Sequence, residues 1–269
     1  MRNAAVTSAG ARIRWTELPG GSPPRVYIHG IGAMSSAYYG EVAADPRLGR
    51  ARALLIDMLG FGLSDRPADF GYTLDDHADV LARALEAAGV RAAELVGHSM
   101  GSAVAIILAH RYPGLVSSLV LVDANLDPYV PERTPGSSGI ATYSEAEFLA
   151  GGWAEVRDRV GEHWWATMRL AGREALYRSA VHLARGTTPT MREHLLGLDI
   201  PRTFIHPEQD PPIGSRQLSS AGVALVPVAG AGHNVMLDNP EAFILAVAAH
   251  SRRAGHACGG VIPAGCCGR

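Results

Sequence analysis

The chain contains no lysine, and all 24 of its basic residues are arginine. This absence excludes chemistry that requires a lysine amine, such as a phosphate-binding P-loop, a pyridoxal Schiff base or a Ser/Lys catalytic dyad. The 26 acidic residues bring the net charge to −2. A charge so close to balance gives no reason to expect a nucleic acid or an anionic membrane as a partner.

Cysteine is scarce and occurs only near the C-terminus, at Cys258, Cys266 and Cys267. The body of the chain therefore has neither a thiol nucleophile nor a cysteine-based zinc site. Long apolar runs are also missing. The longest, residues 242–249, is less than half of the ~20 residues that span a bilayer, and the N-terminus has no signal-peptide pattern. We expect a soluble cytoplasmic protein without a membrane span, of undetermined oligomeric state.

Short apolar runs typical of buried strands alternate with helical patterns along most of the chain. The predicted strands include residues 26–28, 54–56, 95–96, 119–122, 203–205 and 223–228. The clearest predicted helices cover residues 74–88, 100–112 and 239–253. Alternating strands and helices predict an α/β fold with a mostly parallel sheet covered by helices on both faces.

The alternation stops between residues 125 and 198, where helical patterns dominate and aromatic residues are concentrated. We interpret residues 125–198 as a helical insertion into a core domain formed by residues 1–124 and 199–254. Residues 255–269 are rich in glycine, alanine and cysteine without periodicity, and we expect a disordered tail there.

The strongest chemical signal is the G-x-S-x-G pattern Gly97-His98-Ser99-Met100-Gly101. It follows a predicted strand and leads directly into a predicted helix, which is the context of a nucleophile elbow. Such a turn holds the serine in a strained backbone conformation, and the glycines let neighbouring backbone approach. The pattern predicts Ser99 as a nucleophile.

A serine hydroxyl needs a base and a carboxylate that orients this base. Of the 11 histidines, we favour His233, because it lies in a glycine-rich loop between the last predicted strand and the last helix. Two aspartates compete for the acid. Asp210 follows the strand before the one leading to His233, and Asp123 ends the strand at residues 119–122. Both stand between serine and histidine in the chain; we favour Asp210 for its loop position, with Glu208 as a minor candidate.

A tetrahedral oxyanion requires two backbone N–H donors, and the residue after the nucleophile, Met100, supplies one. A second glycine-rich turn, His29-Gly30-Ile31-Gly32, follows a predicted strand and leaves the Ile31 N–H unobstructed. Its G-x-G also begins a dinucleotide-binding pattern, but Ser35 occupies the third small position, so that alternative fails.

Taken together, these motifs resemble the α/β-hydrolase fold superfamily, specifically its serine esterase-like branch, to about residue 253. The matching segments are residues 29–32, 57–64 and 97–101, Asp210, and Gly232-His233. The resemblance implies a sheet of about eight strands, a helical cap after the sixth, a Ser99/Asp210/His233 triad and no cofactor. It gives the 57–64 loop a role in shaping the site wall. Pro207 departs from the glycine that many relatives have there.

The function implied is hydrolysis of an ester, thioester or lactone of a hydrophobic small molecule through an acyl-enzyme intermediate. We expect His29, Gly30, Trp164 and Trp165 to line the substrate pocket, and no metal to take part. Carbon–carbon bond hydrolysis or lyase chemistry uses similar residues, and a ligand receptor could retain the triad. These alternatives remain open at the level of the sequence.

Overall fold

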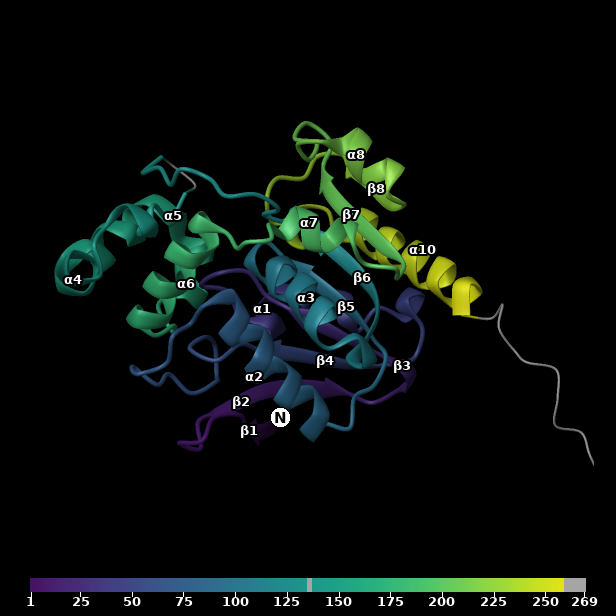
Figure 1. The fold of residues 1–269 in the computed structure, drawn as a ribbon, viewed down its shortest axis with the longest axis horizontal. Coiled ribbons are helices and arrows are strands. Elements are labelled where there is room, and N and C mark those ends of the chain that lie inside the picture. The colour runs from purple at the N-terminus through teal and green to yellow at the C-terminus, as the bar shows by residue number, and fades with distance from the viewer. Residues whose placement is uncertain (135–136, 259–269) are drawn as a thin grey trace, which may run out of the picture.

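The computed structural model describes residues 1–134 and 137–258. Its centre is one eight-stranded sheet with the strand order β1-β2-β4-β3-β5-β6-β7-β8 (Figure 1). The strands are β1 (Arg2–Ala5), β2 (Arg12–Leu18), β3 (Gly21–Ile28), β4 (Ala51–Asp57), β5 (Ala93–His98), β6 (Val116–Val122), β7 (Arg202–Pro207) and β8 (Val223–Val228). All six strands predicted from apolar runs are present, so the predicted fold class is confirmed.

The two N-terminal strands differ from the rest. β1 pairs with β2, and β2 with β4, in antiparallel orientation, whereas all the other neighbours are parallel. In β2, buried positions alternate with partly exposed ones, as in Ile13 and Trp15, whereas β5 is buried along its whole length. The apolar runs therefore did not reveal this edge, because a half-buried strand contains no continuous apolar run.

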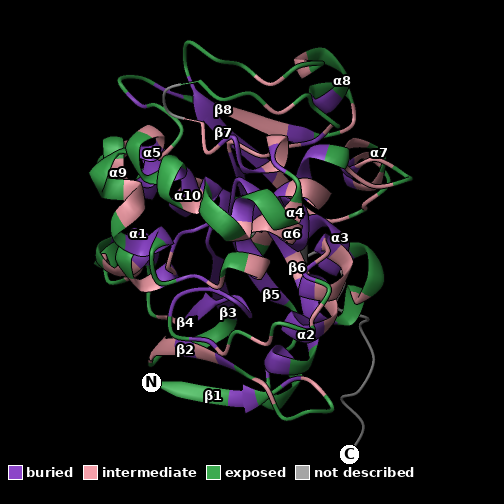
Figure 2. Ribbon diagram, turned by 90° about the vertical axis from the view of Figure 1, so that its left-hand side faces the viewer, coloured by how far each residue is buried: buried purple, intermediate pink, exposed green. Residues whose placement is uncertain are grey.

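Helices cover both faces of the sheet. α2 (Leu74–Ala87) and α3 (Met100–Arg111) pack on one face, and α1 (Ser35–Ala43) and α10 (Pro240–Cys258) pack on the other. Each face of the sheet has its own hydrophobic core. Successive side chains of a strand point to opposite faces, so Val26 and Ile28 belong to the core under α2 and α3, and Tyr27 belongs to the core under α1 and α10. Figure 2 shows the buried residues concentrated on the sheet and on the inner sides of these helices.

The ends of the helices follow from local sequence. Thr73 and Asp76 form a reciprocal capping box at the start of α2. At the start of α10, the side chain of Asn239 accepts a hydrogen bond from the Ala242 N–H at 3.1 Å. α10 extends to Cys258, so the expected disordered tail does not begin at residue 255; residues 259–269 lie outside the described part of the chain.

Between β6 and β7, every regular element in the described residues is helical. The elements are η3 (Ile140–Thr142), α4 (Glu145–Glu147), η4 (Phe148–Gly152), α5 (Trp153–Met168), α6 (Arg173–Arg185) and α7 (Met191–Leu196). In Figure 1, α4, α5 and α6 stand beside the sheet, while α7 lies over α3. α5 is broken at Gly161, which has a φ of 74°. The remaining short helices, α8 (Ser215–Ser220) and α9 (Val235–Asp238), flank β8.

Among the helices of residues 1–134 and 137–258, none has the length and apolar character needed to cross a membrane.

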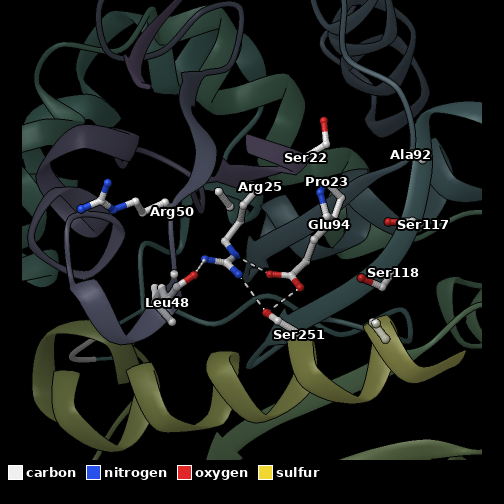
Figure 3. A pocket seen from close by; sticks show the side chains of 14 residues that line it. Ser22, Pro23, Arg25, Leu48, Arg50, Ala92, Glu94, Ser117, Ser118 and Ser251 are labelled. Atoms are coloured by element: carbon white, nitrogen blue, oxygen red, sulfur yellow. Dashed lines mark hydrogen bonds and ion pairs between the residues drawn. The ribbon is translucent and has the colours of Figure 1, made fainter. Parts of the chain in front are cut away.

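A buried ion pair lies where the parallel strands begin. The Arg25 guanidinium contacts the Glu94 carboxylate, and both residues are at most 5% exposed. Arg25 also donates to the Ser251 hydroxyl at 2.8 Å and to the Leu48 carbonyl at 3.2 Å (Figure 3). These groups line a cavity of about 560 Å³. Because their charges are paired with one another, the cavity offers a ligand no free charge from this pair.

We expect Glu94→Ala to destabilise the fold strongly, because it leaves the Arg25 charge buried without its partner. Breaking a buried pair on one side typically costs about 3–5 kcal/mol. The control is Asp75→Ala, which removes one partner of the exposed Arg111–Asp75 pair and should change the free energy of unfolding by about 1 kcal/mol or less. Urea denaturation measures both variants; equal losses would contradict the importance assigned to burial.

Candidate functional site

Ser99 occupies the turn between β5 and α3, with φ 51° and ψ −119°. A non-glycine residue reaches a positive φ only at an energetic cost, and such residues cluster at functional sites. The turn is possible because Gly97 and Gly101 have no side chains. A Cβ on Gly101 would lie 2.4 Å from the Ile28 carbonyl oxygen, and one on Gly97 would lie 2.6 Å from the Gly101 carbonyl oxygen. The elbow predicted from G-x-S-x-G is thus present in its geometry.

Ser99, His233 and Ile31 meet at one cavity. It has a volume of about 290 Å³ and is lined by Gly30, Ile31, Ala33, Tyr38, His98, Ser99, Val160, His163, Trp164, His233 and Asn234. The core contributes most of these residues, and the insertion contributes the last turn of α5 before Gly161 and the first turn after it. The cavity lies at the edge where the parallel strands end, opposite the Arg25–Glu94 pair. This is the edge at which α/β folds place their ligands.

The carboxylate beside His233 is Asp123. The Nδ1–H of His233 donates to Asp123 Oδ2 at 2.6 Å, and their side chains are 49% and 23% exposed. Asp123 follows the last residue of β6 and has a φ of 43°. Its N–H donates to the Ile205 carbonyl at 2.9 Å, which fixes the aspartate between β6 and β7. A carboxylate at Nδ1 sets the tautomer in which Nε2 can accept a proton.

The favoured pairing of Asp210 with His233 is therefore not found, and the rival aspartate occupies that place. Asp210 is exposed, and its N–H closes a turn by donating to the Pro207 carbonyl at 3.1 Å. In this turn it is Gln209 that faces the histidine loop, where its amide donates to the Ala231 carbonyl at 2.6 Å. Asp210 lines a second cavity of about 280 Å³ together with Asp123. Glu208, the minor candidate, is also exposed.

Asn125 is a site residue that the sequence reasoning missed. The Ser99 hydroxyl donates to Asn125 Oδ1 across 3.5 Å, a long hydrogen bond, whereas no hydrogen bond joins Ser99 to His233 among the described residues. Catalytic hydrogen bonds are often long before a substrate binds. Its position in the sequence could have indicated a place in the site, because Asn125 stands two residues after Asp123, just beyond the end of the strand adjacent to β5.

The two predicted oxyanion donors, Met100 and Ile31, come from two turns that contact each other. Met100 is the first residue of α3, and the first N–H groups of a helix have no partner within it. Ile31 lies in a turn in which the Ala33 N–H donates to the Gly30 carbonyl at 3.2 Å. Gly30 rests directly against the elbow, since a Cβ there would lie 3.3 Å from the Ser99 Cβ. The first turn and the elbow are therefore in direct contact.

Two buried histidines support the site from behind. His98 Nε2–H donates to the His233 carbonyl at 2.9 Å, and burial lowers the pKa of His98 well below its usual value. His29 accepts from the Met58 N–H at 3.0 Å, and burial likewise lowers its pKa. Neutral imidazole rings thus act here as rigid spacers between loops. His29 is fully buried and does not line the cavity, so its predicted place in the substrate pocket is wrong.

The remaining pocket predictions divide. Gly30 and Trp164 line the cavity, and Trp164 Nε1–H donates to the Ile31 carbonyl at 2.9 Å. Trp165 does not line it, because its ring faces Trp153 with 4.5 Å between ring centroids. Successive residues on a helix point about 100° apart, so two adjacent tryptophans cannot share one face. In the 57–64 loop, Asp57 accepts from the N–H groups of Ser35 and Leu63, each at 2.9 Å, which is the predicted structural role.

Known proteins match part of the chain in sequence. A family model described as alpha/beta hydrolase fold matches residues 23–141. A 2-hydroxymuconate semialdehyde hydrolase of Pseudomonas sp. (strain CF600) is 37% identical over 118 residues, 44% of this chain and 41% of that protein. The probable lysophospholipase BODYGUARD 3 of Arabidopsis thaliana is 36% identical over 124 residues, 43% of this chain and 24% of that protein. The aligned part is thus less than half of either relative.

Similarity of structure extends over almost the whole chain. The crystal structure of a bromoperoxidase from Bacillus anthracis superimposes with a TM-score of 0.75, covering 93% of this chain and 99% of the other at 20% sequence identity. At this identity the likeness concerns the fold alone. The sheet order, the elbow at Ser99 and the family model agree with one another. Residues 23–141 thus match the α/β-hydrolase fold family, and the described chain as a whole has that fold.

Proposed function

We propose that this chain is a serine hydrolase that cleaves a compact, uncharged carboxylic ester through an acyl-enzyme intermediate. Ser99 is the nucleophile, His233 the general base and Asp123 the carboxylate that orients it. The observation that carries the proposal is the 2.6 Å hydrogen bond between His233 and Asp123, together with the cavity that His233 shares with the strained Ser99. Nucleophile, base and orienting acid are the three roles that acyl transfer requires.

In the first half of the reaction, His233 Nε2 takes the Ser99 proton while Ser99 Oγ attacks the ester carbonyl carbon. The N–H groups of Ile31 and Met100 hold the oxyanion of the tetrahedral intermediate. Collapse releases the alcohol, which takes its proton from His233. Water activated by His233 then attacks the acyl group on Ser99, and the carboxylic acid leaves. Before attack, the Ser99 hydroxyl has to turn from Asn125 Oδ1 toward His233.

The charges around the site favour a neutral substrate. None of the described residues that line the 290 Å³ cavity is an arginine. In the neighbouring cavity, Arg192 already pairs with Asp127 at 2.6 Å, and Asp123 and Asp210 add negative charge. A carboxylate or phosphate entering the 290 Å³ cavity would lose its hydration without gaining an arginine as a partner. The volume is at the small end of the range for ligand pockets, which favours short acyl or aryl groups.

Residues 125–198 act in this proposal as a cap on the core domain formed by residues 1–124 and 199–254. Val160, His163 and Trp164 of the insertion close one side of the cavity. A cover of this kind keeps bulk water from the acyl-enzyme and strengthens the electrostatic interactions beneath it.

Carbon–carbon bond hydrolysis is the second candidate, and the semialdehyde hydrolase from Pseudomonas supports it. The name hydroxymuconate denotes a substrate that bears a carboxylate. Because the cavity has no arginine to pair with such a group, ester hydrolysis takes precedence.

The first test of the proposal removes the nucleophile. We expect Ser99 to react with a fluorophosphonate probe, and Ser99→Ala to lose labelling and about a millionfold in turnover, the typical cost of removing a triad serine. Ser219→Ala is the control, because Ser219 is an exposed serine on α8 outside the cavity of Ser99, and its loss should change neither labelling nor turnover. Ester turnover by Ser99→Ala within tenfold of the wild type would reject the mechanism.

The second test separates the two aspartates. Asp123→Asn should abolish the low-field proton resonance of the His233 Nδ1–H bond and lower turnover by roughly 10⁴-fold, because the histidine loses its tautomer. Asp210→Asn should keep both the resonance and most of the activity, since Asp210 is exposed and lies outside that bond. Proton NMR and initial rates measure the pair. The opposite ranking would assign the acid to Asp210.

The third test concerns substrate charge. We expect kcat/KM to be highest for uncharged short-chain aryl esters, thioesters or lactones, and at least about tenfold lower for esters of the same size that bear a carboxylate, the equivalent of about 1.4 kcal/mol. Initial rates on a matched panel, including a carboxylated vinylogous diketone, measure this. A preference for the diketone would favour carbon–carbon hydrolysis instead.

A further inference from the structure

One face of α5 is packed on the turn that contains the Ile31 oxyanion donor. Trp164 Nε1–H donates to the Ile31 carbonyl at 2.9 Å. One helical turn later, the Met168 side chain lies against Gly32, where a Cβ would be 2.9 Å from the Met168 Cε. Residues four apart project from the same face of a helix. Both contacts therefore come from the short part of α5 that follows the break at Gly161.

The carbonyl that Trp164 holds belongs to the one peptide whose orientation distinguishes two common turns. Gly30 to Ala33 form a β-turn closed by the Ala33 N–H, with φ 68° at Gly32 and no positive φ at Ile31. This combination identifies a type II turn, and type I differs from it mainly by a flip of the central peptide. In this turn the central peptide joins Ile31 to Gly32. The hydrogen bond from Trp164 holds it in the type II orientation.

The Ile31 N–H stands one peptide before this carbonyl and is used in no hydrogen bond among the described residues. Oxyanion donors act only when they are held about 2.7–3.1 Å from the position of the developing charge. A turn whose central peptide is free to flip cannot hold its preceding N–H at that precision. Restraint of the carbonyl therefore restrains the donor.

We propose that Trp164 is a positioning residue that holds the oxyanion turn in its active form through the hydrogen bond from its indole to the Ile31 carbonyl. The proposal rests on the function proposed above and gives the insertion a second task besides covering the cavity. Because the same indole lines the cavity, contact with substrate and support of the oxyanion donor depend on one side chain. Displacement of the insertion would release the turn.

The test replaces the indole with a ring that cannot donate. Trp164→Phe should lower kcat on a neutral aryl ester by about 10- to 100-fold, which is below the 10²–10³-fold typical of losing an oxyanion donor itself. KM should change by less than about threefold, since most of the ring remains. The matched control is Trp15→Phe, which removes an indole hydrogen bond to Glu17 on β2.

A second readout isolates the oxyanion. Phenylboronic acid forms a bond from boron to Ser99 Oγ, the serine proton passes to His233, and an oxygen on the anionic boron occupies the oxyanion site. Trp164→Phe should weaken inhibition by phenylboronic acid about as much as it lowers kcat, and leave inhibition by the product phenol unchanged. A role in packing alone would change the two inhibitors equally.

Three results would overturn the proposal: the same kinetics for Trp164→Phe and Trp15→Phe, a raised KM with unchanged kcat, or equal weakening of both inhibitors. If Trp164→Phe does not fold, replacement of the Trp164 indole by benzothiophene removes only the N–H donor and is judged by the same criteria. Labelling of wild-type Ser99 by the fluorophosphonate probe tests the proposed function separately from the role of Trp164. A labelled wild type with an unaffected Trp164→Phe rejects this inference and leaves the proposed function standing.

Discussion

The approach of α3 to the ends of the parallel strands is the constraint on which the candidate site depends. The backbone at Gly101 lies so close to the Ile28 and His29 carbonyl oxygens that any side chain there would overlap them. This contact fixes the end of β3 against the elbow. One residue later, the Ser102 hydroxyl donates to the Gly97 carbonyl at 2.6 Å and accepts from the Val122 N–H at 3.2 Å. The first turn of α3 thereby connects the ends of β3, β5 and β6.

The same constraint explains why the carboxylate comes from β6. β6 is hydrogen-bonded directly to β5, whereas β7 is one strand further away. The residue after Val122 therefore lies next to Ser99. With its positive φ, this residue, Asp123, has its carboxylate within hydrogen-bonding distance of His233. The histidine loop after β8 reaches this place because the buried His98 holds the His233 carbonyl. Positioning here is done mainly by uncharged groups, which suits a site where burial disfavours charge.

The charged groups differ between the two ends of the parallel strands. At the edge where the strands begin, Arg25 and Glu94 are buried and satisfied by one another and by Ser251. At the edge where they end, the cavity contains titratable histidines but no arginine. Beside this cavity, Trp164 of α5 donates a hydrogen bond to the Ile31 carbonyl. A compact site that lacks arginine and is partly built by α5 supports the acyl transfer on a neutral substrate that we propose.

Most of the sheet and the turn at Ser99 could be predicted from local patterns in the sequence. Apolar runs and glycine spacing are local properties, so they predicted the six parallel strands and the turn at Ser99, and they drew attention to the turn at Ile31 and the loop of His233. β1 and β2 were not predicted, because β1 is mostly exposed, β2 is only partly buried, and neither contains a continuous apolar run. Which of Asp123 and Asp210 bonds to His233 could be read only from the folded chain, since both follow strands in permitted chain order and the answer depends on which strand adjoins β5. The different contacts of Trp164 and Trp165 also depend on the folded structure. The two residues are adjacent in the chain, but their side chains leave the helix in different directions, so Trp164 contacts Ile31 and Trp165 contacts Trp153.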